Sequence, residues 1–94
     1  MEATENLGQA CVTIALRGAR EYLARHNLTA DPAVLGTCVK SWCKIKLPEA
    51  LADAKAALAC NMGSIAEQTF AASMTLAGIE AAKEAGIPKT TEAA

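Results

Sequence analysis

Aromatic side chains are scarce in this chain of 94 residues, which holds one Phe, one Trp and one Tyr. Proteins that bind single-stranded RNA usually stack bases on several aromatic side chains, so the scarcity disfavours that class. An excess of charge is missing as well, because the formal net charge is −1. The whole molecule therefore has no field that would gather nucleic acid or an anionic membrane.

Long apolar runs are also absent, since no stretch reaches the ~18 consecutive apolar residues of a membrane-spanning helix. A secretory signal is not visible: Glu2 and Glu5 stand where basic residues would be needed, and Arg17 interrupts the apolar run that begins at Ala10. We therefore expect a cytoplasmic protein without a membrane partner, whose thiols stay reduced.

Motifs of catalysis are missing too. His26 is the only histidine, and none of the serines (Ser41, Ser64 and Ser73) stands in a nucleophile-elbow motif. No glycine-rich phosphate loop occurs, and no pair of carboxylates has an evident reason to be buried. We expect no enzyme activity and no cofactor.

Alanine is what the chain has in abundance, with 22 residues. Alanine buries little apolar area, so it contributes less to a core than Leu or Phe does. Its small size does let helices approach closely, and association is then a way to bury more surface. β-Branched residues never alternate over a useful length, so strand signals are absent and the chain is expected to be all-α.

Local start and stop signals divide the chain into four segments. Asp31 and Pro32 form a helix start, Pro48 disfavours helical geometry at the residue before it, and Gly63 can adopt a left-handed terminal conformation. Ser64 and Glu67 have the spacing of a capping box. The sequence therefore predicts a small four-helix bundle with short loops and antiparallel neighbours. We expect helices at 4–26, 32–46, 48–61 and 65–85, in one domain of residues 1–88 with a disordered tail at 89–94.

The fourth predicted helix is apolar on two opposite sides and carries no charge from Gln68 to Ile79. One stripe comprises Ile65, Ala72, Leu76 and Ile79, and the other comprises Phe70, Met74, Ala77 and Ala81. A surface helix needs only one apolar stripe, so this helix is either central or shared with a second copy of the chain. We expect a homodimer whose interface includes residues from one of the stripes, with Phe70, Met74, Leu76 and Ile79 as candidates.

Four cysteines invite a metal or disulfide framework, but their spacing does not fit the close pairs of structural zinc sites. We expect no metal site, with Cys11, Cys38, Cys43 and Cys60 as weak candidates. Cys11 and Cys38 fall on apolar stripes, where a thiol is usually an inert small hydrophobe. Cys60 lies opposite the apolar face of its predicted helix, so it is the candidate reactive thiol, and Cys43 is expected to be intermediate.

These observations favour a small cytosolic interaction or accessory module that self-associates and has no catalytic activity of its own. The alternative is a thiol-based protein that binds a soft metal or forms a disulfide as a redox switch. A nucleic-acid adaptor is the weakest alternative, because its basic residues lack interleaved aromatics. The residues of that basic patch are Arg17, Arg20, Lys40, Lys44 and Lys46.

Overall fold

The structure is a computed structural model that describes residues 2–89, with side chains from residue 9 onward. It has three helices, α1 (Glu2–Arg25), α2 (Pro32–Ala59) and α3 (Gly63–Ala85), and two short strands, β1 (Leu28–Thr29) and β2 (Ile87–Pro88). The helical class is confirmed, but the prediction of four helices is wrong, because the described residues form a three-helix bundle. Most of the expected tail, residues 90–94, lies outside the described residues.

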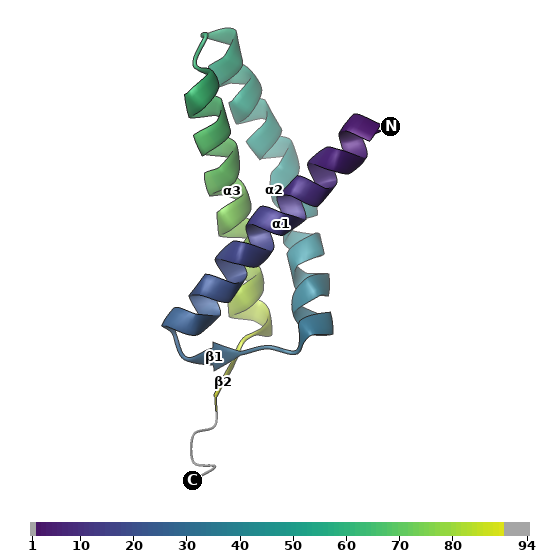
Figure 1. Ribbon diagram of the computed structural model, residues 1–94, viewed down its shortest axis with the longest axis vertical. Helices are drawn as coiled ribbons and strands as arrows, with labels where there is room; N and C mark the ends of the chain where they lie inside the picture. Colours follow the sequence, from purple (N-terminus) through teal and green to yellow (C-terminus); the bar gives the residue numbers. More distant parts are fainter. Residues whose placement is uncertain (1, 90–94) are drawn as a thin grey trace.

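The predicted second and third helices are a single helix, α2, which contains Pro48. A proline inside a helix removes one backbone hydrogen bond and crowds the carbonyl four residues earlier, which kinks a helix without having to end it. Buried residues on both sides of Pro48 hold the two halves of α2 in the same core, among them Val39, Cys43 and Ala50. Tertiary packing therefore overrides the local break, and Figure 1 shows α2 changing direction where it passes behind α1.

A three-residue turn joins α2 to α3 and makes them antiparallel (Figure 1). Asn61 adopts the left-handed conformation there, with φ of 58°. The N–H of Met62 donates to the Ala57 carbonyl at 2.9 Å, and the N–H of Asn61 donates to the Leu58 carbonyl at 3.0 Å. These two bonds are a Schellman motif, in which Asn61 takes the place that the sequence assigned to Gly63.

The start of α3 also differs from the prediction. Met62 is the N-cap and makes no side-chain capping bond, so the expected capping box from Ser64 to Glu67 does not form. Because the Schellman turn ends at Met62, the chain enters α3 directly, and Ser64 already lies within its first turn. The helix therefore begins two residues earlier than the pattern indicates.

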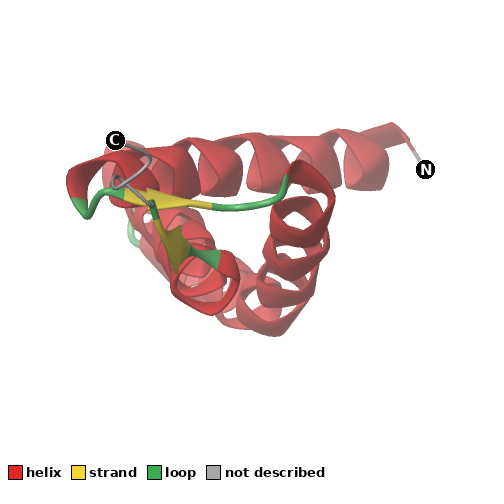
Figure 2. Ribbon diagram, turned by 90° about the horizontal axis from the view of Figure 1, so that it is seen from below, coloured by secondary structure: helices red, strands yellow, loops and turns green. Residues whose placement is uncertain are grey.

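Helix α1 lies across one face of the α2–α3 pair, and this face is turned toward the viewer in Figure 1. Figure 2, seen from below, shows the same arrangement, with α1 on one side and the other two helices beneath it. The crossing with α3 is close: a Cβ on Gly18 would lie 3.0 Å from the backbone oxygen of Thr75. Helix α1 covers only part of the pair, so the end of the α2–α3 hairpin projects beyond it.

Two short strands tie the ends of α1 and α3 together, although the sequence shows no strand pattern. Thr29 pairs with Ile87 and Leu28 pairs with Pro88 in an antiparallel register. The N–H of Lys89 extends this contact by donating to the Asn27 carbonyl at 3.2 Å. A pair of two-residue strands is too short to leave a periodic signal in the sequence.

The core is built mainly from small residues. The largest fully buried side chains are those of Met74, Val39 and Cys11, and alanines from all three helices fill much of the remainder. Such a core supplies limited apolar burial, and several larger apolar side chains stay exposed. Among the helices that the structure describes, none is both long and apolar enough to span a bilayer.

Candidate functional site

The two apolar stripes of α3 have different surroundings. On the inner side, Met74, Ala77 and Ala81 are fully buried, and Phe70 is half-buried against the core. On the other side, Ile65 and Leu76 are 46% and 53% exposed. We call this side the outer stripe of α3, and it comprises Ile65, Ala72, Leu76 and Ile79. Among the candidate interface residues, Met74 therefore belongs to the core, whereas Leu76 is open to contact.

The outer stripe continues onto α1 through a hollow of about 220 Å³ beside Ile79. Gly18 and Tyr22 of α1 line it together with Thr75 and Ile79 of α3, and the polar side chains of Glu21, Arg25 and His26 complete its wall. The Tyr22 ring lies against the His26 ring, with 4.2 Å between centroids and 32° between planes. Ile79, which is half-buried, therefore stands at the junction of the stripe and the hollow.

A second apolar surface lies between α2 and α3 near the end of their hairpin. This hairpin groove has a volume of about 380 Å³, and its lining includes Leu51, Leu58, Ala66 and Phe70. Leu58 is 57% exposed there. The sequence does not predict this groove, because the spacing places Leu51 and Leu58 in a separate helix after Pro48. Phe70, a candidate interface residue, contributes to this groove and not to the outer stripe.

Two of the four thiols lie together between α1 and α2. Cys11 and Cys43 are both buried, and both line a hollow of about 280 Å³. Burial, with a smaller effect from the neighbouring Cys11, raises the pKa of Cys43 to about 11. Burial likewise raises the pKa of Cys11. Both thiols are therefore protonated at neutral pH, which makes them poor nucleophiles and poor metal ligands without a further change.

The other two thiols are more accessible. Cys60 is exposed at the end of α2, where the sequence predicts it. Cys38 is half-buried, and partial burial together with the nearby Glu84 carboxylate raises its pKa. Cys43 is more buried than expected and Cys38 less so, because the buried line of α2 runs through Leu35, Val39 and Cys43. In the described part of the chain, no group of three or more His, Cys, Asp or Glu side chains converges as a metal site would require.

The basic residues of α2 are divided between two surroundings. Lys40 and Lys44 line the hollow beside Cys11 and Cys43. Lys46 instead places its Nζ 5.8 Å from the centre of the Trp42 ring. The Trp42 Nε1–H also donates to the Glu84 Oε1 of α3 at 3.0 Å. The lysines of the expected basic patch therefore lie in two different surroundings, which weakens the case for a single phosphate-binding surface.

No protein family model, curated protein or solved structure matches this chain. Among the features predicted from the sequence, the outer stripe of α3 is the one that leaves large apolar side chains, Ile65 and Leu76, about half exposed.

Proposed function

We propose that this protein is a helical interaction module that binds a second copy of itself through the outer stripe of α3. The observation that supports the proposal is the two-sided character of α3. Met74, Ala77 and Ala81 are buried in the core on one side, whereas Ile65 and Leu76 are about half exposed on the other. A second apolar stripe adds nothing to the fold of one chain, so its burial needs a partner. The cytoplasmic location expected from the sequence belongs to the same proposal.

A twofold axis at Ala72 suits the order of residues on the stripe. With two α3 helices antiparallel about that axis, Ile65 of one copy meets Ile79 of the other, and Gln68 meets Leu76. The small side chain of Ala72 lets the helices approach at the centre. At 1.5 Å per residue, the stripe from Ile65 to Ile79 is about 21 Å long.

The hollow beside Ile79 gives this arrangement a place for a side chain. Because Ile65 of the second copy comes opposite Ile79, its exposed side chain fits toward the hollow that Gly18, Tyr22 and Thr75 line. This contact would extend the interface from α3 onto α1. Stable interfaces bury about 800 Å² on each partner, which is roughly an eighth of the 6274 Å² surface of this chain. A stripe one helix wide buries less area than a stable interface does, so we expect weak, micromolar association.

Sedimentation velocity at tens of micromolar tests the proposal with two matched variants. Leu76→Lys places a charge on the outer stripe, and Leu58→Lys makes the same change in the hairpin groove at a similarly exposed leucine. We expect the unmodified protein and Leu58→Lys to sediment as dimers and Leu76→Lys to sediment as a folded monomer. A monomeric unmodified protein contradicts association, and dissociation by Leu58→Lys alone contradicts the outer stripe as the interface.

A thiol-based redox protein is the second candidate, and the pairing of Cys11 with Cys43 across α1 and α2 supports it. Oxidation would join the two sulfur atoms, release two protons and pass two electrons to glutathione disulfide, which would leave as two glutathione thiols. The raised pKa of both cysteines opposes the reaction, because attack requires a thiolate. Intact mass after incubation with glutathione disulfide tests this alternative: loss of two hydrogens, mapped to Cys11 and Cys43, would favour it over the association module.

A further inference from the structure

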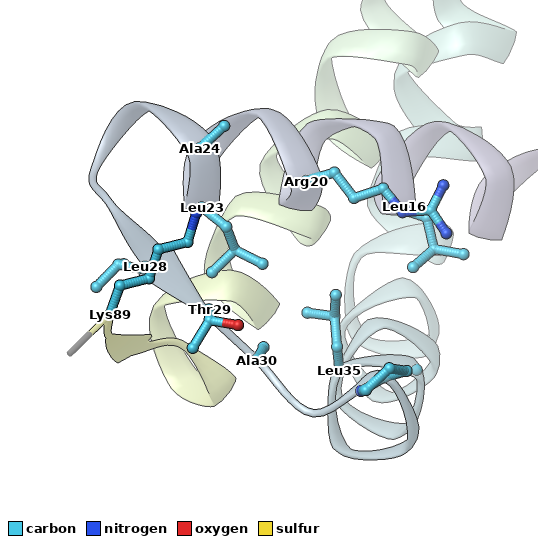
Figure 3. Close-up of a pocket in the computed structure, with 11 residues that line it drawn as sticks. Leu16, Arg20, Leu23, Ala24, Leu28, Thr29, Ala30, Leu35 and Lys89 are labelled. Atoms are coloured by element: carbon cyan, nitrogen blue, oxygen red, sulfur yellow. The ribbon is translucent and has the colours of Figure 1, made fainter. Parts of the chain in front are cut away.

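A further hollow lies away from the outer stripe, where α1, β1 and the start of α2 meet. Its volume is about 450 Å³, within the range of small-molecule sites. Figure 3 shows Leu23 of α1 and Leu35 of α2 pointing into the space between these elements. The backbone between α1 and α2 closes one end, through Leu28, Thr29 and Ala30. Most of its lining lies between residues 16 and 36, and Lys89 reaches it from beyond α3.

Four leucines supply the apolar part of the pocket wall, and Arg20, Thr29 and Lys89 supply polar groups. Leu23 and Leu35 are buried, whereas Leu16 and Leu28 are half-buried and present part of their surface to the hollow. Gly36 adds further room, because a Cβ built on it would meet no atom within 4 Å. The leucine part of the wall suits an aliphatic chain, and the polar part suits a charged head group.

The charged residues that line the pocket are both cations, Arg20 and Lys89. In Figure 3, Arg20 extends along α1 toward Leu16, and Lys89 extends toward Leu23, so the charges flank the apolar walls. No acidic side chain lines this pocket within the described residues. Asp31, at the nearby start of α2, directs its carboxylate to the N–H groups of Ala33 and Val34, at 3.1 and 3.2 Å. Positive charge is therefore combined here with an apolar interior.

We infer that this pocket binds a small amphiphilic anion, a free monomeric fatty acid whose tail lies among the leucines and whose carboxylate pairs with Arg20 or Lys89. Arginine offers a carboxylate two parallel N–H donors, and lysine offers a mobile point charge. A cationic amphiphile of the same length would meet the same walls but the wrong charge. Ligand charge therefore separates recognition from simple partition into an apolar surface.

Titration of the protein with decanoate, followed by isothermal calorimetry and by amide NMR shifts, tests the inference. Decylamine is the matched ligand, since it is a cation with the same tail. We expect saturable decanoate binding with shifts at Leu28, Thr29 and Gly36, and at least tenfold weaker binding of decylamine. Equal affinity for both ligands, shifts confined to other surfaces, or no saturable decanoate binding would overturn the inference. Binding of the protein to anionic vesicles, without binding of free decanoate, would also overturn the inference.

Two variants locate the ligand. Gly36→Leu fills the open space and replaces a helical glycine by a better helix former, so we expect a folded protein that no longer binds decanoate. Arg20→Gln should weaken binding by about fivefold, as expected for an exposed ion pair. Arg17→Gln is its control, because Arg17 is exposed on α1 but does not line the pocket. Unchanged binding by the folded Gly36→Leu protein, or equal effects of the two arginine changes, would contradict the assignment.

Discussion

Gly78 of α3 lies directly against Ala15 of α1, so that a Cβ on Gly78 would overlap the carbonyl oxygen of Ala15. Both residues are buried, and the overlap involves backbone atoms that cannot rotate away. The absence of a side chain at residue 78 therefore sets how closely α1 and α3 cross. This crossing also fixes the hollow beside Ile79, into which the second copy is proposed to insert Ile65.

Gly78→Ala should destabilise the fold, because the two helices must separate to admit the new methyl group. Overpacking of this kind costs about 1 to 3 kcal/mol, and a clash with backbone favours the upper end. Urea unfolding followed by circular dichroism measures the loss. Gly36→Ala is the control, since no atom lies within 4 Å of its added Cβ, and it should stabilise α2 by up to about 1 kcal/mol. Equal stability of Gly78→Ala and the unmodified protein would contradict the close crossing.

Met74→Lys and Leu76→Lys should have opposite consequences although they are two residues apart. Met74 is fully buried in the core, so a lysine there places a charge among apolar side chains and should cost about 3 kcal/mol or more. Leu76 is 53% exposed, and its replacement should leave the folded monomer within roughly 1 kcal/mol of the original. Thermal unfolding of both variants distinguishes the stripes. A larger loss of stability from the change at Leu76 than from the change at Met74 would contradict the orientation of α3, in which Met74 faces the core.

The buried thiol of Cys43 should make the protein less stable in alkaline solution. Burial and the neighbouring Cys11 raise the pKa of Cys43 from its ordinary value of 9.0 to about 11. Between these values the unfolded chain releases the thiol proton while the folded chain retains it, so stability falls as pH rises from 9 to 11. The expected loss is roughly 2 to 3 kcal/mol.

Urea unfolding at several pH values in this window, with Cys43→Ala as the control, isolates the effect of this thiol. The variant should lose less stability between pH 9 and 11 than the unmodified protein, since the remaining alkaline titrations are shared. Identical slopes in the two proteins would show that Cys43 titrates as an ordinary exposed thiol.

Alkylation of the folded protein at neutral pH should follow the exposure of the four thiols. We expect Cys60 to react fastest, Cys38 to react more slowly, and Cys11 and Cys43 to be protected by burial and by their raised pKa values. Peptide mass spectrometry after timed exposure to N-ethylmaleimide measures each rate. In denaturant the four rates should converge, and convergence already in the folded protein would contradict the packing of α1 on α2.

Local periodicity predicted the two-sided character of α3, because a helical stripe depends only on spacing within one element. It failed at Pro48, since the burial of Val39 and Ala50 on either side of the proline is a tertiary effect. The turn after α2 shows that local signals also fail to identify which residue ends a helix. Asn61 and Gly63 can both adopt a left-handed conformation, and the bond from Met62 to Ala57 determines which of them does.

The candidate sites also divide into features that helical spacing predicts and features that depend on contacts between helices. The exposure of Cys60 follows from helical phase, but phase alone does not show which stripe of α3 faces the core. That choice depends on where α1 crosses α3, which Gly18 and Gly78 determine through contacts with residues about 60 positions away. The pocket between Arg20 and Lys89 requires the pairing of β1 with β2, which the sequence does not indicate.

Cross-linking at residue 72 tests the proposed association most directly, because Ala72 lies on the twofold axis of the expected dimer. In a protein with Cys60→Ser, an added Ala72→Cys would place two thiols opposite each other, whereas Ala56→Cys places a thiol at another exposed alanine, on α2. Treatment with a short bis-maleimide should yield a covalent dimer of the Ala72→Cys protein and leave the Ala56→Cys protein monomeric. Equal dimer yields from both proteins, or a dimer from Ala56→Cys alone, would contradict pairing through the outer stripe of α3.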